Sequence, residues 1–119
     1  MNALRILMLV AAAAFSTGAM AHAVVKQSVP AEGARLTAAP KEVTITFNEK
    51  VEKMFTSAVL KTAAGVAIDT AKATRDAANP AVLHLPLPAL PAGAYVVTWT
   101  AVGQDGHRQS GHIGFSVTR

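Results

Sequence analysis

The sequence contains no cysteine and few aromatic residues: one Trp, one Tyr and four Phe among 119 residues. The lack of cysteine excludes disulfides and thiolate ligands, so a metal site must use His, Asp, Glu, Met or backbone donors. The few aromatics argue against a sugar-binding surface. The formal net charge is +4, and the Lys and Arg residues are scattered along the chain, so no basic patch suited to nucleic acid is present.

No apolar run reaches the roughly 20 residues that a membrane-spanning helix needs. The apolar run at 6–15 follows Arg5 and precedes Ala19-Met20-Ala21, a pattern typical of a secretory signal peptide cleaved before the next residue. We therefore expect residues 1–21 to be removed, leaving an exported single domain at 22–119 that begins with His22. The alternative is an uncleaved N-terminal anchor.

The sequence also lacks a long helical period and instead alternates apolar and polar residues over short segments. The pattern is clean at 43–47 and strongest at 94–102, where Trp99 is expected at the centre of the core. The other predicted strands are 23–28, 57–62, 66–68, 81–85 and 113–118. About seven short strands separated by turn residues predict an all-β, immunoglobulin-like sandwich.

Some segments are less regular. Residues 35–40 read as an irregular connection, and 69–79 as either a helical turn or a loop. Pro86, Pro88 and Pro91 are too closely spaced for a central strand, so an edge or a loop is expected there.

The motif Asp105-Gly106-His107 falls in the link between the last two predicted strands. It offers a carboxylate and an imidazole close together, and the links of a sandwich gather at its two ends. His22, at the start of the first strand, can therefore meet Asp105 and His107 at one end. After cleavage, His22 would supply both its imidazole and a free α-amine.

These donors amount to three nitrogens and one carboxylate oxygen, a set that suits one tetragonal Cu(II) ion. Zn(II) could use the same atoms but prefers a tetrahedron. Cu(I) prefers sulfur ligands, and only Met54 follows the predicted cleavage site. The α-amine must lose its proton to bind, so affinity should fall with pH, and the uncleaved precursor lacks this ligand.

Other ionisable residues have simpler interpretations. A lone His in a loop is usually solvated, so His22 and His107 are supported as metal ligands only when they are considered together. His84 is expected on a strand, facing solvent or partly packed. His112 is expected to point away from the core, and its closeness to His107 in the sequence leaves open a place in the outer shell of a metal site. Glu49, just beyond the strand at 43–47, either is solvated or lies near a metal or a partner.

Several motifs across the whole mature chain resemble the CopC family of periplasmic copper-resistance proteins. They are His22 at the mature start, Pro30-Ala31-Glu32-Gly33, residues 43–49 (VTITFNE), residues 90–95 (LPAGAY) with Trp99, and Asp105-Gly106-His107. The resemblance implies a Greek-key β-sandwich in the periplasm that binds one Cu(II) through His22, Asp105 and His107. It also implies that Glu49 lies near the copper, as a weak or indirect ligand.

The same resemblance implies a partner, a CopD-like inner-membrane protein, for a monomeric copper carrier or buffer in copper homeostasis and resistance. Some members have a Met-rich Cu(I) site, which this sequence lacks. Two other functions remain open: a copper oxidoreductase that uses the N-terminal His, and a metal-free sandwich that binds another protein. A hydrolase built from Ser110, His107 and Asp105 has little support, because no nucleophile elbow is present.

Overall fold

The computed structural model describes residues 22–118. The predicted signal peptide at 1–21 therefore lies outside the described residues. Within 22–118 all regular structure is β-strand, and no helix is long and apolar enough to cross a membrane.

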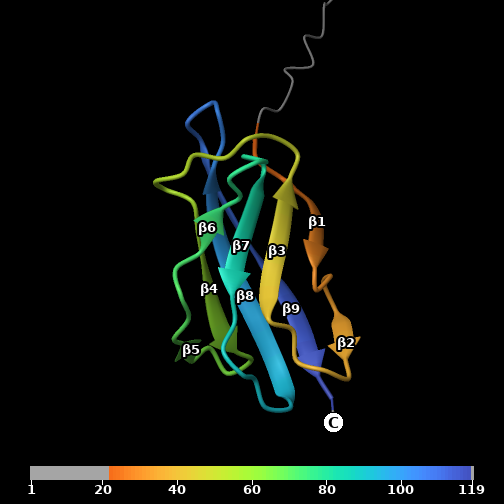
Figure 1. The fold of residues 1–119 in the computed structure, drawn as a ribbon. Helices are drawn as coiled ribbons and strands as arrows, with labels where there is room; N and C mark the ends of the chain where they lie inside the picture. The colour runs from red at the N-terminus through yellow and green to blue at the C-terminus, as the bar shows by residue number, and fades with distance from the viewer. Residues whose placement is uncertain (1–21, 119) are drawn as a thin grey trace, which may run out of the picture.

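The described chain forms two sheets that pack face to face (Figure 1). The four-stranded sheet has the order β1-β3-β7-β6, and the five-stranded sheet has the order β2-β9-β8-β4-β5. The strands are β1 (Val25–Val29), β2 (Ala34–Leu36), β3 (Glu42–Phe47), β4 (Ser57–Thr62), β5 (Ala67–Ile68), β6 (Thr74–Arg75), β7 (Val82–Pro86), β8 (Gly93–Val102) and β9 (Arg108–Val117). The predicted all-β sandwich is confirmed.

The core between the sheets follows the alternation seen in the sequence. On β3, Val43, Ile45 and Phe47 are buried, while the threonines between them face outward. On β8, Trp99 is buried, and its ring meets Phe47 edge-on with 5.2 Å between ring centroids. This aromatic pair joins the two sheets, since β3 and β8 belong to different layers.

Two short strands differ from the sequence-based prediction. Residues 35–40 were predicted to be an irregular connection, but β2 pairs in parallel with the end of β9, with Ala34 opposite Phe115. Within 69–79, β6 pairs with His84 and Leu83 of β7. Both strands are defined by backbone pairing with a partner strand, and each segment is too short to show an alternation of its own.

The structure also tests where the prolines lie and where the last strand begins. Pro86 is the final residue of β7, beyond the two positions at which β6 pairs, and Pro88 and Pro91 lie in the following loop. β9 starts at Arg108, five residues earlier than predicted. Its N-terminal half has a polar, exposed pattern, which hid the strand from a search for buried alternation.

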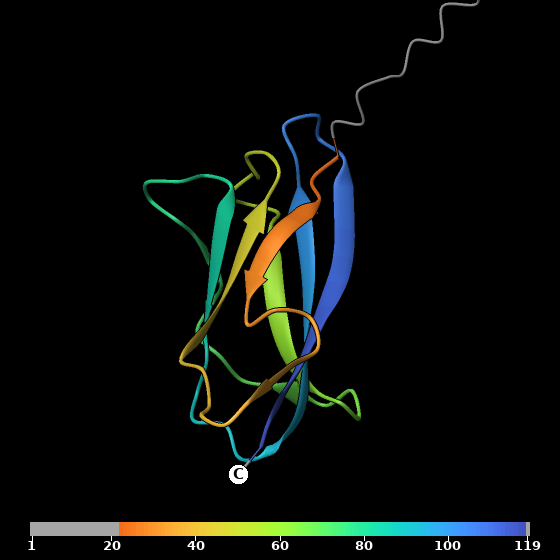
Figure 2. The ribbon, with the colours of Figure 1, turned by 90° about the vertical axis from the view of Figure 1, so that its right-hand side faces the viewer.

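The start of β1 and the link between β8 and β9 lie at the same end of the sandwich (Figure 2). The β1–β3 pairing places Val25 opposite Phe47, so the residues before β1 extend past the end of β3. The ten-residue pairing of β8 with β9 ends at Val102 and Arg108. The fold thus brings residue 22 and residues 103–107 to one end, as predicted.

Candidate metal centre

The link between β8 and β9 is a closed turn that holds Asp105 and His107 together. The Gly106 N–H donates to the Gly103 carbonyl at 3.0 Å, and the Gly103 N–H donates to the His107 carbonyl at 3.2 Å. Gly106 has a φ of 78°, in the left-handed region that glycine adopts without steric cost. This is why the motif has a glycine between its two polar residues.

Asp105 interacts with His107 through both of its carboxylate oxygens. Oδ1 accepts the backbone N–H of His107 at 3.0 Å, and Oδ2 lies 3.0 Å from His107 Nδ1. The backbone hydrogen bond and the nearby imidazole together hold the pKa of Asp105 below its usual value. The carboxylate is therefore ionised at neutral pH and available to a cation.

Asn48 positions the segment that contains His22. Its backbone N–H donates to the Val24 carbonyl at 2.9 Å. Its side-chain Oδ1 accepts the Val24 N–H at 2.8 Å, and its Nδ2 donates to the His22 carbonyl at 3.2 Å. Ala23, between these two residues, is buried in the core. The backbone around His22 is thus fixed on both sides.

This placement brings His22 onto the β8–β9 link. His22 Nδ1 lies 3.4 Å from Asp105 Oδ2, and the rings of His22 and His107 have centroids 5.1 Å apart. One ligand atom from each of His22, Asp105 and His107 lies within 4.8 Å of the other two. The structure therefore brings together the three residues that the sequence analysis selected as principal ligands.

The donor atoms fit a transition-metal ion. His22 Nδ1 is buried and has no hydrogen-bond partner. Its contact with Asp105 meets the distance of an ion pair but is not a hydrogen bond. A buried polar atom without a partner is costly, and a metal ion bound to it would remove that cost. Nitrogen and carboxylate donors suit Cu(II) or Zn(II) better than Cu(I). Met54 is the one methionine among residues 22–118, and it is 83% exposed, so the described residues offer no cluster of sulfur ligands for Cu(I).

Glu49 lies next to this group but is not part of it. Its Oε1 accepts the Gln104 N–H at 3.3 Å, so it supports the residue that precedes Asp105. A Cβ at Gly103 would overlap Glu49 Oε1 and would lie 3.3 Å from Asp105 Oδ1. Glu49 thus packs directly against the link, and a side chain at position 103 would require the Glu49 carboxylate to move.

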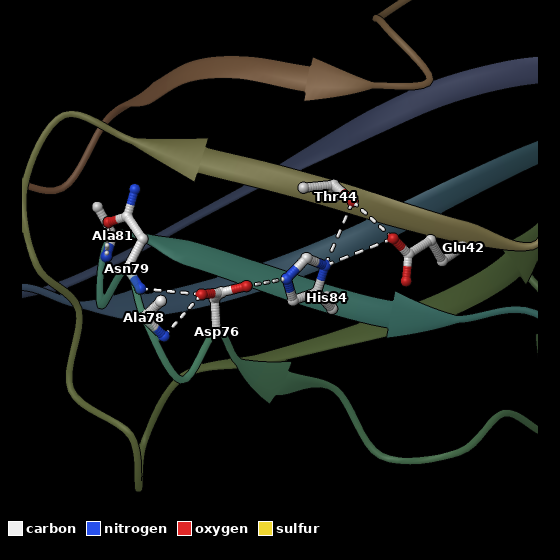
Figure 3. A network of polar contacts seen from close by, with 7 residues as sticks. All are labelled: Glu42, Thr44, Asp76, Ala78, Asn79, Ala81 and His84. Atoms are coloured by element: carbon white, nitrogen blue, oxygen red, sulfur yellow. Dashed lines mark hydrogen bonds and ion pairs between the residues drawn. The ribbon is translucent and has the colours of Figure 1, made fainter.

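The two remaining histidines are placed as predicted. His112 is exposed on β9, opposite Thr98, and does not join the three-residue group. His84 is half-buried on the outer face of β7, where it forms a separate polar network (Figure 3). There, His84 Nε2 lies 2.7 Å from Asp76 Oδ2, and Asp76 Oδ1 accepts the backbone N–H groups of Ala78 and Asn79, each at 2.8 Å.

The Asp76 network gives a prediction for stability against pH. The hydrogen bond from His84, followed by those from Asn79 and Ala78, lowers the pKa of Asp76 from 3.8 to about 2. Because the folded-state pKa is depressed, the stabilisation is complete above about pH 4 and is lost as the pH falls toward 2. We expect Asp76→Asn to be destabilising at pH 5–7 and its deficit to shrink below about pH 4, measured by urea unfolding.

A matched control for this experiment is Asp69→Asn, which changes an exposed carboxylate in the loop after β5. Its effect should stay within about 0.5 kcal/mol, as is usual for an isolated surface residue. A deficit of Asp76→Asn that does not change between pH 5 and pH 2 would contradict the proposed role of its charge.

Sequence reasoning did not identify Asn48 as a functional residue. The only available indication was its place immediately after the alternating strand, beside Glu49. Its importance depends on the β1–β3 register, which brings it to Val24 across the sheet. A single sequence does not specify that register.

Comparison with known proteins gives consistent matches. The model of the CopC domain family matches residues 25–118. Protein YobA of Escherichia coli K12 is 39% identical over 98 residues, which are 82% of this chain and 79% of YobA.

Two solved structures are also similar. The crystal structure of CopC from Methylosinus trichosporium OB3b superposes with a TM-score of 0.75 and 29% identity, over 81% of this chain and 93% of its own. PcoC, a methionine-rich copper resistance protein from Escherichia coli, gives a TM-score of 0.69 and 32% identity, over 82% of this chain and 100% of PcoC. With a family match over nearly the whole described chain and the same sandwich in both structures, this chain belongs to the CopC domain family.

Proposed function

We propose that this protein is a periplasmic Cu(II)-binding protein that acts as a copper carrier or buffer in copper homeostasis and resistance. The observation that supports this best is the group of His22, Asp105 and His107, with ligand atoms within 4.8 Å of one another. The copper resistance function of PcoC, a structural neighbour, supports copper as the cargo. The nitrogen-rich donor set favours the oxidised ion.

In this proposal each residue has a distinct role. His22 contributes its imidazole and, after cleavage of residues 1–21, its α-amine. Asp105 and His107 complete the set with one oxygen and one nitrogen. Glu49 supports the link through Gln104 and remains outside the first set of ligands. Export and copper binding are thereby coupled, because the amine exists only in the processed chain.

We further propose that the protein is not an enzyme. Four donor atoms from three residues would fill the plane around Cu(II) and leave little room for oxygen, which argues against an oxidoreductase. Removal of the ion by a partner is the expected step, and the family resemblance suggests a CopD-like inner-membrane protein. Met54 alone does not make a Cu(I) site, so transfer between two sites within this chain is not proposed.

The direct test is a Cu(II) titration of the protein that begins at His22, followed by electron paramagnetic resonance. We expect one tight, tetragonal, nitrogen-rich site per chain that is lost in His107→Ala. His112→Ala is the matched control, since it removes an exposed histidine of the same domain. Absence of a tight site in the processed protein would refute the copper proposal and favour the protein-binding alternative.

Asn48 provides a second test, of positioning rather than ligation. Asn48→Ala removes the hydrogen bonds that its side chain makes to His22 and Val24. Groups that orient metal ligands typically contribute 10–100-fold to affinity, so we expect a loss of roughly that size with an unchanged paramagnetic spectrum at saturation. Asn79→Ala, in the loop before β7, should leave copper affinity unchanged. An altered spectrum in Asn48→Ala would mean that Asn48 affects the ligand set itself.

A further inference from the structure

The outer face of the four-stranded sheet contains a second group of polar residues. Glu42 and Thr44 lie on β3, on the face opposite Val43 and Ile45, and His84 lies directly across from Thr44 on β7. Figure 3 shows the His84 ring between Glu42 and Thr44 on one side and Asp76 on the other. This group shares no residue with the centre formed by His22, Asp105 and His107.

Asp76 determines which nitrogen of a neutral His84 ring carries the proton. Its Oδ2 lies 2.7 Å from His84 Nε2, while its Oδ1 is held by two backbone N–H groups. An ionised carboxylate can only accept, so the proton of a neutral His84 is assigned to Nε2. The lone pair of Nδ1 then points toward the other side of the ring. The same carboxylate–histidine arrangement orients many metal-binding histidines.

On that other side, His84 Nδ1 meets a second carboxylate. Nδ1 lies 3.6 Å from Glu42 Oε1 and 3.4 Å from Thr44 Oγ1, and Thr44 Oγ1 lies 3.2 Å from the same oxygen of Glu42. The Thr44 hydroxyl has one proton and can donate to Nδ1 or to Glu42, but not to both. The hydroxyl therefore satisfies only one of these two acceptors, and the other is left to solvent or to a cation, since the Glu42 side chain is 52% exposed.

The three distances also match those between the ligands of a bound metal. Metal–nitrogen and metal–oxygen bonds of about 2.0–2.2 Å in a tetrahedron place neighbouring ligand atoms about 3.4 Å apart. The triangle of Nδ1, Oε1 and Oγ1 has edges of 3.2–3.6 Å. A metal ion could thus bind without a large rearrangement of β3 or β7.

We propose that His84 and Glu42 form a second binding site for a divalent transition-metal ion, Zn(II) or Cu(II), on the outer face of this sheet. Thr44 and solvent complete the coordination, and Asp76 orients the imidazole. With only two strong protein ligands and a partly exposed position, the site binds more weakly than a centre with more ligands. It takes up a second ion independently of the site at the β8–β9 link.

The test uses Zn(II) as the probe at pH 7.5, with ring ¹⁵N resonances that report each histidine separately. In the metal-free protein, His84 should show a protonated Nε2 and a bare Nδ1. Zn(II) should move the Nδ1 resonance to the position of a metal-bound nitrogen, both in the wild type and in His107→Ala. The readout at His84 thus separates this inference from the proposed function, which depends on His107.

Calorimetric titration with Zn(II) in the His107→Ala background, which removes a proposed ligand of the first centre, provides the affinities. Relative to His107→Ala alone, the added Glu42→Gln should weaken Zn(II) binding at least tenfold, and the added Asp76→Asn should weaken it by roughly 10–100-fold. His112→Ala is the matched control and should leave this binding unchanged. Glu42→Gln alters an exposed strand end, so the fold should persist in that variant.

Two outcomes would overturn the inference. One is a His84 ring that is protonated on both nitrogens at pH 7.5 and unchanged by Zn(II), which would make the group an ion-pair network only. The other is Zn(II) binding of equal affinity in His107→Ala with and without Glu42→Gln.

Discussion

Cu(II) is expected to raise the melting temperature of the protein that begins at His22 by roughly 16–33 °C when its concentration is a thousand times its Kd. A ligand that binds only the folded state adds about 4.1 kcal/mol at that excess. Each kcal/mol moves the melting temperature of a domain of this size by about 4–8 °C. The required donors meet only in the folded chain, because His22 and Asp105 come from opposite ends of the domain. Calorimetric scans with and without Cu(II) measure the shift.

Two altered proteins test which groups cause this shift. A form that retains Ala21 converts the amine of His22 into an amide, which cannot bind as a neutral amine does, so most of the shift should disappear. His107→Ala removes one imidazole and should also reduce it strongly, whereas His112→Ala should retain it. A full shift in the form that retains Ala21 would exclude the α-amine as a ligand.

Phe47→Ala is expected to lower the free energy of unfolding by about 3–5 kcal/mol, the usual cost of removing a buried aromatic ring. Phe47 is 2% exposed and packs edge-on against Trp99 in the opposite sheet. A domain of this size has only about 5–15 kcal/mol of stability, and no disulfide supports this one. Urea unfolding followed by the fluorescence of Trp99, the only tryptophan, measures the loss.

Phe55→Ala is the matched control for Phe47→Ala, because it removes the same ring from a side chain that is 59% exposed. Its cost should stay within about 0.5 kcal/mol. Similar losses in the two variants would mean that the Phe47–Trp99 pair does not anchor the sandwich.

The sequence was sufficient where one segment alone determined the outcome. β3 and β8 were predicted because the alternation of Val43, Ile45 and Phe47, or of Tyr95, Val97 and Trp99, records which face is buried. β2 and β6 were missed because each is only two or three residues long and exists through its partner strand. Their segments have no periodicity of their own that could be recognised.

The same distinction applies to the candidate centre. Asp105 and His107 were found because a short motif places both groups in one turn, and His22 because a cleavage pattern precedes it. The role of Asn48 could not be predicted, since it depends on the strand register that brings it to Val24. The position of Glu49 beside Gly103 likewise follows from packing between two loops that are distant in the sequence.

The contact between His22 and Asp105 joins segments that lie roughly 80 residues apart, near the two ends of the described chain. Contacts of such high sequence separation require the closure of a long loop, which local hairpins do not. His22 and Asp105 can meet only after β1 has paired with β3 and after β9 has paired with β8. The centre therefore forms only in a chain whose first and last strands are both in place, and its assembly reports that the domain has finished folding.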